Sequence, residues 1–472
     1  MPPSTTYLTE IIHDGPDADV APPTDDDAPD NPQATHRTDT DKRAATAEDS
    51  PTNLPDKFWS SRGYLTHIRR AAHSRTLSAD SVLGCVLARV AILTPPTVQL
   101  PAIVAATATL DLLIALVADS GVGKSASTHV AADLLPIIDE TVVLDFPVGS
   151  GEGIVDAYLG QIEELNDHGK KVRVRRQTKR AVLAVIDEGQ VLAEFANRKG
   201  STLMPTLRSA WSGSTLGQGN ASAETNRKVQ GGRYRFAAII AVQPAHAASL
   251  LADAAGGTPQ RILWLTAQDP TIPDEAPQWP GPIAFLPPTH YTLAAPMKVD
   301  DDINYEIRAR KLARSRGKHK DADPLDSHAD LLRLKIAALL AILDERLNVN
   351  ADDWELARMV MSTSQGVRTV VVMHAQLDAR HREEAATGKA IRREVALSGS
   401  AESRALDKAA RAVGKRAHRT PGEQLTRREF SHGIASRDRQ LTTVDDAIAE
   451  AIRQGWIEKN GDTFTAGKKM PQ

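Results

Sequence analysis

Short apolar runs alternate with helical patterns through the middle of the chain. Five mostly apolar runs predict strands, at residues 112–117, 142–146, 181–186, 236–242 and 262–265. The segments between several of them, beginning with the one after Lys124, have the spacing of helices. Continuous apolar runs are typical of parallel strands that are buried on both faces of a sheet. The pattern therefore predicts an α/β fold with a parallel sheet at its core.

Helical periodicity also flanks this region on both sides. Before it, apolar positions recur at helical spacing from Tyr64 to Ala72 and from Val82 to Val90. After it, residues 303–380 become helical. The stretch from 381 to 425 is basic and poor in large apolar residues, so we expect a linker there.

The last part of the chain has the pattern of a small independent domain. One helix is expected to start near Thr426 and the next near Thr443, and residues 455–464 are expected to form a hairpin with an Asn-Gly turn. This order of elements predicts a winged helix, a fold that binds DNA or docks proteins. Residues 380–428 carry 13 basic and 6 acidic residues, which favours DNA, but both alternatives stay open.

Charge is distributed unevenly along the chain, although the totals nearly balance. The chain has 57 Lys and Arg residues and 60 Asp and Glu residues, a net charge of −3. Residues 1–56 alone carry 13 acidic and 3 basic residues and 9 of the 28 prolines, so we expect this acidic leader to be disordered. The rest of the chain has a net charge of +7, which makes it mildly basic.

A single cysteine and an interrupted apolar stretch indicate the cellular setting. With only Cys85, one chain can form neither a disulfide framework nor a multi-cysteine zinc site, which predicts the cytosol as the compartment. The longest apolar stretch, Val98–Val117, is broken by polar residues and a proline, and no apolar signal region follows a basic N-terminus. We therefore expect a cytoplasmic protein with no membrane span and no secretion signal.

The sharpest chemical signal is a glycine-rich loop between a predicted strand and a predicted helix. Residues 118–125 read Ala-Asp-Ser-Gly-Val-Gly-Lys-Ser, in the context that a phosphate-binding loop needs. Gly121 and Gly123 supply the backbone freedom to curl N–H groups around phosphate oxygens. Lys124 is expected to hold the β- and γ-phosphates of a nucleotide, and the Ser125 hydroxyl to ligate Mg²⁺.

Two acidic residues follow the predicted strand at 181–186. Asp187 is placed to hold a Mg²⁺-bound water, and Glu188 to orient and deprotonate the water that attacks the phosphate. An acid pair after a strand is often only a turn, but Asp187 comes 63 residues after Lys124 and the pair has no rival elsewhere in the chain. The loop and the acids together predict an ATP-hydrolysing site.

Two further polar residues at strand ends are candidates for the same chemistry. Gln243 follows the strand at 236–242 and is expected to hydrogen-bond the γ-phosphate or the attacking water. Arg261 opens the strand at 262–265, where a planar cation could reach the γ-phosphate of a neighbouring subunit. The alternatives are a polar residue before a helix-starting proline and an arginine held in a salt bridge.

With these motifs in order, the chain resembles the ring-forming P-loop ATPases of phage and plasmid replication, helicase-like proteins that often accompany primase-polymerase modules in actinobacterial elements. The segments that carry the resemblance are residues 83–100, 149–153, 187–190, 242–244 and 259–261. It implies an AAA+ or RecA-like sheet core, ATP and Mg²⁺, and a homo-oligomeric ring. In the loop, the nucleotide is expected to contact Ser120, Gly121, Val122, Gly123, Lys124, Ser125 and Ala126.

The motif order is also similar to that of the minichromosome maintenance helicases. That resemblance implies a helical lid with a second sensor arginine that binds the nucleotide, and Arg333 is the nearest candidate. His328 and Lys335 are the alternatives, because the register of the lid is open. Two residues depart from the family pattern: Ala118 replaces a glycine, which is tolerable at negative φ, and Gln243 replaces an asparagine. These departures leave the subgroup open but not the nucleotide.

Two segments are candidates for contact with DNA. Residues 170–180 contain seven basic residues, which could line a central channel or form a basic surface hairpin. The Gly- and Asn-rich segment 216–235 contains one aromatic residue, Tyr234, for base stacking. In the motors that the chain resembles, the loop at this place couples hydrolysis to movement along DNA.

The expected organisation is a leader at 1–56, a helical segment at 57–100, an ATPase core at 101–300, a lid at 301–380, a basic linker at 381–424 and a winged-helix-like domain at 425–472. We expect an ATP-dependent helicase or translocase on DNA, single-stranded by preference, in the replication of a phage, prophage or plasmid. The alternatives are an ATP-switched DNA-binding regulator or helicase loader, and a packaging or stress ATPase with a protein substrate. No polymerase or nuclease constellation is visible, so a primase or polymerase would be a separate partner.

Overall fold

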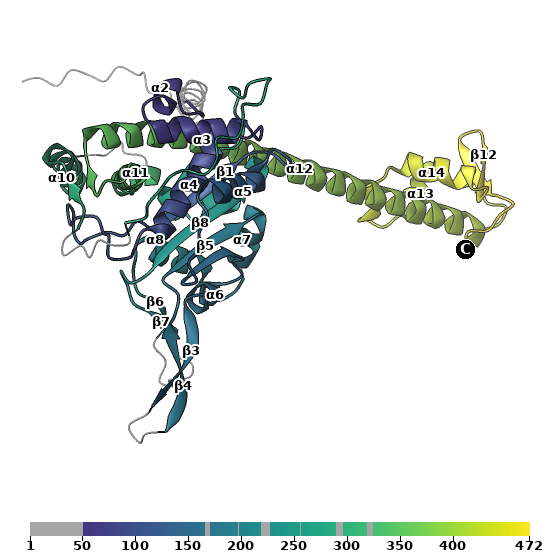
Figure 1. The fold of residues 1–472 in the computed structure, drawn as a ribbon. Helices are drawn as coiled ribbons and strands as arrows, with labels where there is room; N and C mark the ends of the chain where they lie inside the picture. The colour runs from purple at the N-terminus through teal and green to yellow at the C-terminus, as the bar shows by residue number, and fades with distance from the viewer. Residues whose placement is uncertain are drawn as a thin grey trace, which may run out of the picture. The chain divides into compact units, whose positions relative to one another are not determined.

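The computed structural model describes residues 51–165, 170–196, 198–218, 227–254, 256–288, 296–318 and 324–472. Most of the expected acidic leader, residues 1–50, lies outside these ranges. Figure 1 shows the chain as a ribbon with its helices and strands labelled.

A five-stranded parallel sheet forms the centre of the fold (Figure 1). Its strands lie in the order β2, β5, β8, β1 and β9, and every neighbouring pair is parallel. β1, β8 and β9 are buried along their whole length, as continuous apolar runs require. The α/β prediction is confirmed, with small changes at the strand ends: β1 (Leu112–Val117), β2 (Val142–Phe146), β5 (Ala181–Ile186), β8 (Arg235–Val242) and β9 (Ile262–Thr266).

Helices cover both faces of this sheet. α4 contacts four of the five strands and is buried along its whole length, including Cys85. A Cβ atom at Gly84 would lie 2.6 Å from Leu265 Cδ1 and 3.2 Å from Ile114 Cγ2, so the glycine lets α4 approach the strands closely. The connection from β1 to β2 crosses the sheet in one direction, and the connections that lead to β8 and β9 cross it in the other direction. Crossovers between parallel strands are right-handed, so helices in connections of opposite direction lie on opposite faces of the sheet. α5 therefore lies beside α4, and α7 and α9 lie on the other face. These helices are α2 (Asp56–Trp59), α3 (Gly63–His73), α4 (Ala79–Leu93), α5 (Lys124–Leu134), α7 (Gly189–Ala196), α8 (Leu203–Trp211) and α9 (Ala248–Ala252).

A helical layer follows the sheet and covers one of its edges. α12 packs along β9, where the Trp264 N–H donates a hydrogen bond to Ser364 Oγ at 2.8 Å. Because β9 is an edge strand, this contact satisfies a backbone donor that another strand could otherwise engage. The region expected as a lid is helical as predicted, and consists of α10 (Asp301–Ser315), α11 (Ala329–Leu343) and the first part of α12 (Ala351–Arg419), with a short parallel pair, β10 (Lys298–Val299) and β11 (Asn348–Val349).

A buried cluster of charged groups joins the lid to the sheet. Lys335 on α11 is fully buried, and its Nζ donates to Asp111 O at 2.8 Å and to Trp211 O at 2.6 Å. The Asp111 carboxylate accepts from the Phe236 N–H at 2.7 Å and is attracted to Arg235. Burial lowers the pKa of Lys335 and raises that of Asp111, while the attraction between their charges opposes both shifts. Removing Asp111 would leave Lys335 and Arg235 as two buried like charges, and removing Lys335 would break the hydrogen bonds that tie α11 to the sheet.

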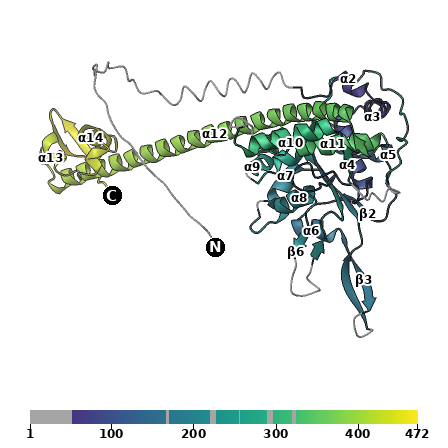
Figure 2. The same cartoon turned by 90° about the vertical axis from the view of Figure 1, so that its left-hand side faces the viewer.

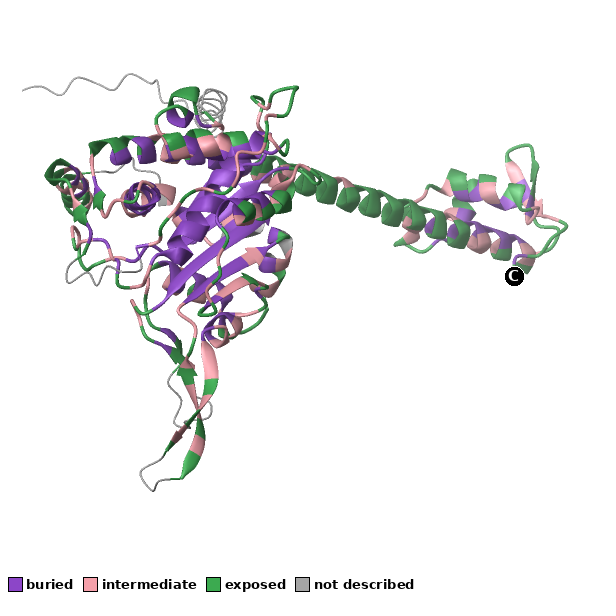
Figure 3. Cartoon of the chain, in the orientation of Figure 1, coloured by how far each residue is buried: buried purple, intermediate pink, exposed green. Residues whose placement is uncertain are grey.

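α12 continues as a single helix through the residues that were expected to form a linker. It runs to Arg419, and its surface between 379 and 404 is exposed along nearly all of its length (Figure 3). The segment is rich in Ala, Glu, Lys and Arg, which are strong helix formers, so few large apolar residues are needed. The basic segment expected as a linker at 381–424 is therefore helical as far as Arg419, and the last turns of the helix place Ala409 and Val413 in a second core.

This second core belongs to the C-terminal part of the chain. Its two helices and its hairpin lie close to the positions that the sequence predicts. The pairing of Asn460 with Thr463 puts Gly461 and Asp462, rather than Asn and Gly, at the two-residue turn. Gly461 has a φ of 67°, which such turns need. The elements are α13 (Arg427–Ser431), α14 (Val444–Arg453), β12 (Ile457–Asn460) and β13 (Thr463–Ala466).

Two antiparallel hairpins lie next to the short helix α6 (Figures 1 and 2). The β3–β4 hairpin contains the basic segment 170–180. The β6–β7 hairpin contains part of the segment at 216–235, of which residues 219–226 lie outside the described ranges. The remaining elements are α6 (Gly151–Asp156), β3 (Leu159–Leu165), β4 (Lys171–Gln177), β6 (Leu216–Gln218), β7 (Arg227–Val229) and the 3₁₀ helices η1 (Pro244–His246), η2 (Pro259–Arg261), η3 (Pro324–Asp326) and η4 (Asp438–Gln440).

Asp80, in the first turn of α4, is a buried acid with a raised pKa. The residue is 2% exposed, and its Oδ2 accepts a hydrogen bond from the Leu54 N–H at 3.0 Å. Burial raises the pKa of the Asp80 carboxyl to about 7, and the Asp269 carboxylate adds to the increase. The folded protein therefore keeps this proton up to about pH 7, whereas the unfolded chain releases it near the ordinary value of 3.8.

The free energy of unfolding should fall as pH rises from about 4 to about 7, because the folded state then binds more protons than the unfolded state. Asp80→Asn should remove this loss. Relative to the unaltered protein, the variant should be more stable at about pH 8 than at about pH 5 by up to about 3 kcal/mol, since about two units of the pKa shift lie above pH 5. Urea unfolding at both pH values measures the difference, with the exposed Asp462→Asn as a control. An equal difference at both pH values would contradict the raised pKa.

Candidate functional site

The carboxyl ends of β5, β8 and β1 meet at one edge of the sheet. β8 lies between the other two strands and is in register with both. The Ala118 N–H donates to Val242 O at 3.1 Å, so the pairing continues one residue beyond β1. The glycine-rich loop follows β1, Asp187 and Glu188 follow β5, and Gln243 follows β8. The structure thus brings these predicted segments together at a single edge.

The backbone of the loop requires its glycines. Gly121 has a φ of 84° and Gly123 a φ of 89°, in the left-handed region that other residues disfavour. Gly123 is also the N-cap of α5, and a Cβ atom there would lie 2.5 Å from Leu77 Cδ2. Ala118 does not have a positive φ, so an alanine fits at this position of the loop without strain.

Lys124 begins α5, and its ammonium group lies over the loop. Its Nζ donates to Ala118 O at 2.7 Å and to Asp119 O at 2.5 Å. Partial burial lowers the pKa of the Lys124 ammonium, and the Asp119 carboxylate acts in the opposite direction. A cation beside a glycine-rich loop at a helix N-terminus is an arrangement that an anionic phosphate chain fits.

Ser125 and Asp187 meet across this edge of the sheet. Ser125 Oγ donates to Asp187 Oδ1 at 3.0 Å, although 62 positions separate the two residues. Both residues are exposed. A hydroxyl and a carboxylate at this separation could both ligate one Mg²⁺, which prefers oxygen ligands and keeps several waters. Ser127, two positions further along α5, is instead buried and contacts Ser81 Oγ at 2.7 Å, a structural contact that no sequence pattern indicated.

Glu188 and Gln243 are accessible at the same edge. Glu188 is exposed and stands directly before α7. The first residue of α7, Gly189, packs closely on β8, since a Cβ atom there would lie 3.1 Å from Ala241 O. Gln243 is half-buried at the end of β8. Both residues follow the carboxyl ends of strands, Glu188 after β5 and Gln243 after β8, and their roles toward a nucleotide stay predictions.

Arg261 lies at the opposite edge of the sheet. It immediately precedes β9, so it stands at the amino end of the strands, whereas the loop follows their carboxyl end. Its Nη1 donates to Gly257 O at 2.5 Å, and its guanidinium lies 5.5 Å from the centroid of the Trp211 ring. The structure therefore does not bring Arg261 to the loop of its own chain, and a role at a neighbouring subunit stays a prediction.

Arg333 is not part of the candidate site, contrary to the expectation from the sequence. Its guanidinium stacks on Trp354, 3.6 Å from the ring centroid, and its Nη2 donates to Trp354 O at 2.8 Å. Its Nη1 pairs with Glu306 at 3.3 Å, and the side chain is only 10% exposed. Packing inside the lid takes up the donors of this arginine, so its assignment to the nucleotide is corrected.

The two alternatives to Arg333 are also held away from the loop. Lys335 is buried with Asp111, and its Nζ lies 3.8 Å from the centroid of the Trp211 ring. His328 packs edge-on against the same ring, with the centroids 5.5 Å apart. Burial, together with the charge of Arg261, lowers the pKa of His328 to about 4. Trp211 thus contacts the cations of Lys335 and Arg261 and the neutral ring of His328 at the amino edge.

The basic segment forms a surface strand that pairs with an acidic one. Four basic side chains of β4 face three carboxylates on β3 and α6. Arg176 binds Glu164 through two hydrogen bonds of 2.8 Å, and Arg173 lies 3.9 Å from Glu163. The number of basic residues in the segment 170–180 therefore overstates the positive charge of this surface. Strand pairing places acidic residues from earlier in the chain beside the basic ones.

The fold defines the structural class of the protein. The protein is a mixed α/β protein with a five-stranded parallel sheet flanked by helices. No protein-family model matches its sequence, and no curated protein matches it either. Within the described ranges, no helix is both long enough and apolar enough to cross a membrane.

Arg333→Lys should lower stability and leave nucleotide binding unchanged, because lysine keeps the charge but loses the stacking and the hydrogen bonds to Trp354. We expect the free energy of unfolding to fall by about 1–3 kcal/mol, measured by urea denaturation. The dissociation constant for ATP should stay within about twofold of the original value. Binding weakened about tenfold with unchanged stability would instead place Arg333 at the nucleotide.

Proposed function

We propose that this protein is a P-loop ATPase of the AAA+ or RecA-like kind, acting as a DNA helicase or translocase in the replication of a phage, prophage or plasmid. One observation carries the proposal. At the edge where β1 and β5 end, Lys124 lies over a glycine-rich loop, and Ser125 Oγ contacts Asp187 Oδ1 at 3.0 Å. ATP with Mg²⁺ fits this arrangement, because the edge supplies backbone N–H groups, a cation and two oxygen ligands.

The order of the strands supports the same location. β1 lies between β8 and β9. The chain leaves β1 toward β2 on one side, and the later connection from β8 passes β1 to reach β9 on the other side. Ligands of open α/β sheets bind in the crevice outside the carboxyl ends of the strands, where such a reversal occurs. The glycine-rich loop stands at that place.

In this proposal, a small number of groups at the carboxyl edge of the sheet bind ATP and Mg²⁺. The backbone N–H groups of residues 120–126, at the start of α5, surround the phosphates. Lys124 neutralises the β- and γ-phosphates, and Ser125 and Asp187 hold Mg²⁺ or its waters. Mg²⁺ supplies positive charge where negative charge develops during hydrolysis.

Hydrolysis then depends on the residues around the bound phosphates. Glu188 orients the attacking water and accepts its proton, and Gln243 hydrogen-bonds the γ-phosphate or that water. The partner subunit's Arg261 stabilises the developing charge in a homo-oligomeric ring, which accounts for its place at the edge remote from its own loop.

The two hairpins are the proposed contacts to DNA. Arg173 and Lys171 are both about three-quarters exposed on β4, and Lys228 is exposed on β7. Such cations bind the phosphate backbone irrespective of sequence and release counterions. Because Glu163 and Glu164 offset part of the charge, we expect DNA binding that weakens with salt, but less steeply than the number of cations alone would give.

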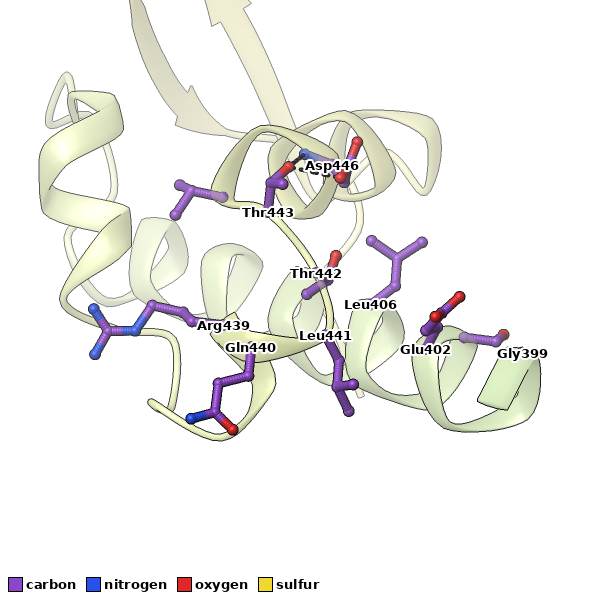
Figure 4. A pocket seen from close by; sticks show the side chains of 11 residues that line it. Gly399, Glu402, Leu406, Arg439, Gln440, Leu441, Thr442, Thr443 and Asp446 are labelled. Atoms are coloured by element: carbon purple, nitrogen blue, oxygen red, sulfur yellow. Dashed lines mark hydrogen bonds between the residues drawn. The ribbon is translucent and has the colours of Figure 1, made fainter. Parts of the chain in front are cut away.

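The C-terminal part is the proposed winged helix. Its elements follow in the order of that fold: the end of α12, an isolated bridge at Leu425, α13, α14 and the β12–β13 hairpin. Asp445 and Asp446 stand in the first turn of α14, where Asp445 is paired with Arg427 and Asp446 adds a negative charge that repels phosphates. A groove of about 620 Å³ beside this turn is lined in part by Leu406 and Leu441 (Figure 4). These features favour docking of a protein partner, such as a primase or polymerase, over DNA for this domain.

Lys124→Ala should abolish ATP binding, because it removes the cation that faces the phosphates. The unaltered protein should hydrolyse ATP faster with single-stranded DNA than without it, and this stimulation should decrease as salt rises. Steady-state ATPase assays across a salt series measure both effects, with the exposed Lys298→Ala as a control. ATP turnover retained in Lys124→Ala would overturn the site.

The same measurements separate the motor from its alternatives. Tight ATP binding with negligible turnover would favour a switch, which is a DNA-binding regulator or a helicase loader. Turnover that responds neither to DNA nor to joint neutralisation of Arg173, Arg175 and Arg176 would favour an ATPase with a protein substrate. Stimulation by DNA together with strand unwinding favours the motor.

Glu188→Gln should leave ATP binding intact and stop hydrolysis, because glutamine keeps the shape of the side chain but cannot accept the proton of the water. We expect turnover to fall at least about 100-fold with an unchanged dissociation constant for ATP. Single-turnover ATPase assays and equilibrium binding measure the two effects, with the exposed Glu458→Gln as the matched control. Unaltered turnover would remove Glu188 from this role.

A further inference from the structure

The helix α6 contacts strands of both hairpins (Figures 1 and 2). It leads directly into β3 and also touches β6 and β7. Among the described residues, no strand of one hairpin pairs with a strand of the other. Strand pairing therefore does not join the two hairpins, and α6 is an element that both of them touch.

Close packing fixes the base of each hairpin on this helix. A Cβ atom at Gly217 of β6 would clash with the Arg227 carbonyl oxygen and would lie 3.1 Å from Cγ1 of the buried Val155. On the other hairpin, the Thr178 N–H donates to Tyr158 O at 2.9 Å, where α6 leads into β3. The bases are thus held by burial and backbone contacts, which do not position the exposed cations.

Asp156, the last residue of α6, joins the exposed parts of the two hairpins through one oxygen. Its Oδ1 accepts a hydrogen bond from Arg175 Nη1 on β4 at 3.2 Å and lies 3.3 Å from Arg227 Nε on β7. These side chains are 31% to 41% exposed. Ion pairs at such exposure add little to overall stability, so the consequence of this contact is positional.

We propose that Asp156 is a positioning residue that holds the two hairpins as a single DNA-binding unit. The inference rests on the proposed function, because DNA is the ligand of that unit. Because one carboxylate fixes both Arg175 and Arg227, the cations of the two hairpins keep a set spacing. A DNA strand that binds them then loses less free energy to the ordering of these side chains. A negative charge at this place repels phosphates, so the positional effect must exceed that repulsion.

Asp156→Asn and Glu163→Gln form a matched pair of variants. Each replaces a carboxylate of this surface by an amide, but Glu163 pairs with Lys171 and Arg173, which belong to one hairpin. Anisotropy of a fluorescein-labelled single-stranded oligonucleotide across a salt series measures binding. We expect Glu163→Gln to bind about twofold more tightly, and Asp156→Asn to bind at least about threefold more weakly despite the same change in charge. Asp156→Glu, which keeps the carboxylate, should restore most of the affinity.

Hydrogen exchange of the DNA-free protein tests the link independently of the proposed function. In Asp156→Asn, amide protection should fall in both β4 and β7, whereas in Glu163→Gln it should fall in β4 alone. Unchanged protection of β7 in Asp156→Asn, or DNA binding that tightens as in Glu163→Gln, would overturn the inference. Absence of DNA binding by the unaltered protein would overturn the proposed function, and hydrogen exchange would still decide whether Asp156 ties the hairpins together.

Discussion

The pairing of β1 and β5 with the same parallel strand, β8, is the constraint on which the rest of the structure depends. It places three strand ends at one edge, so that groups far apart in the sequence become neighbours. A register shift of one residue would move a strand end by about 3.3 Å. That displacement would break the 3.0 Å contact between Ser125 and Asp187. Burial of the apolar side chains of β1, β5 and β8 stabilises this register. The polar residues at the carboxyl edge therefore do not have to stabilise the strand pairing themselves.

The two edges of the sheet are built by different physical means. At the carboxyl edge, the polar groups are exposed or half-buried and free to meet a ligand. At the amino edge, Lys335, Asp111 and Arg235 are buried, their opposite charges attract one another, and their hydrogen bonds go mainly to backbone groups. Because Asp111 directly precedes β1, this cluster connects the lid to the strand that leads into the glycine-rich loop. This attachment of the lid thus lies at the edge remote from the proposed nucleotide, in addition to the packing of α12 along β9.

Local features were predictable from the sequence, and features set by tertiary pairing were not. The five strands and the loop could be found because apolar runs and the glycines of the loop act over a few residues. Arg333 was assigned from its place in the lid, but its partner Trp354 lies on another helix. The acids that face the basic strand, including Glu163, are likewise visible only once β3 and β4 are paired. The helix through residues 381–419 was missed for a different reason, since small residues and helix formers suffice for this part of α12.

The burial of Cys85 within α4 has a practical consequence for following motion in this protein. Burial raises the pKa of its thiol to about 12, so almost none of it is thiolate at neutral pH. Maleimide reagents, which attack thiolates, should therefore leave it unmodified in the folded state. A cysteine introduced on a hairpin or on the exposed stretch of α12 would carry a fluorophore or spin label at one site, without first replacing the native thiol.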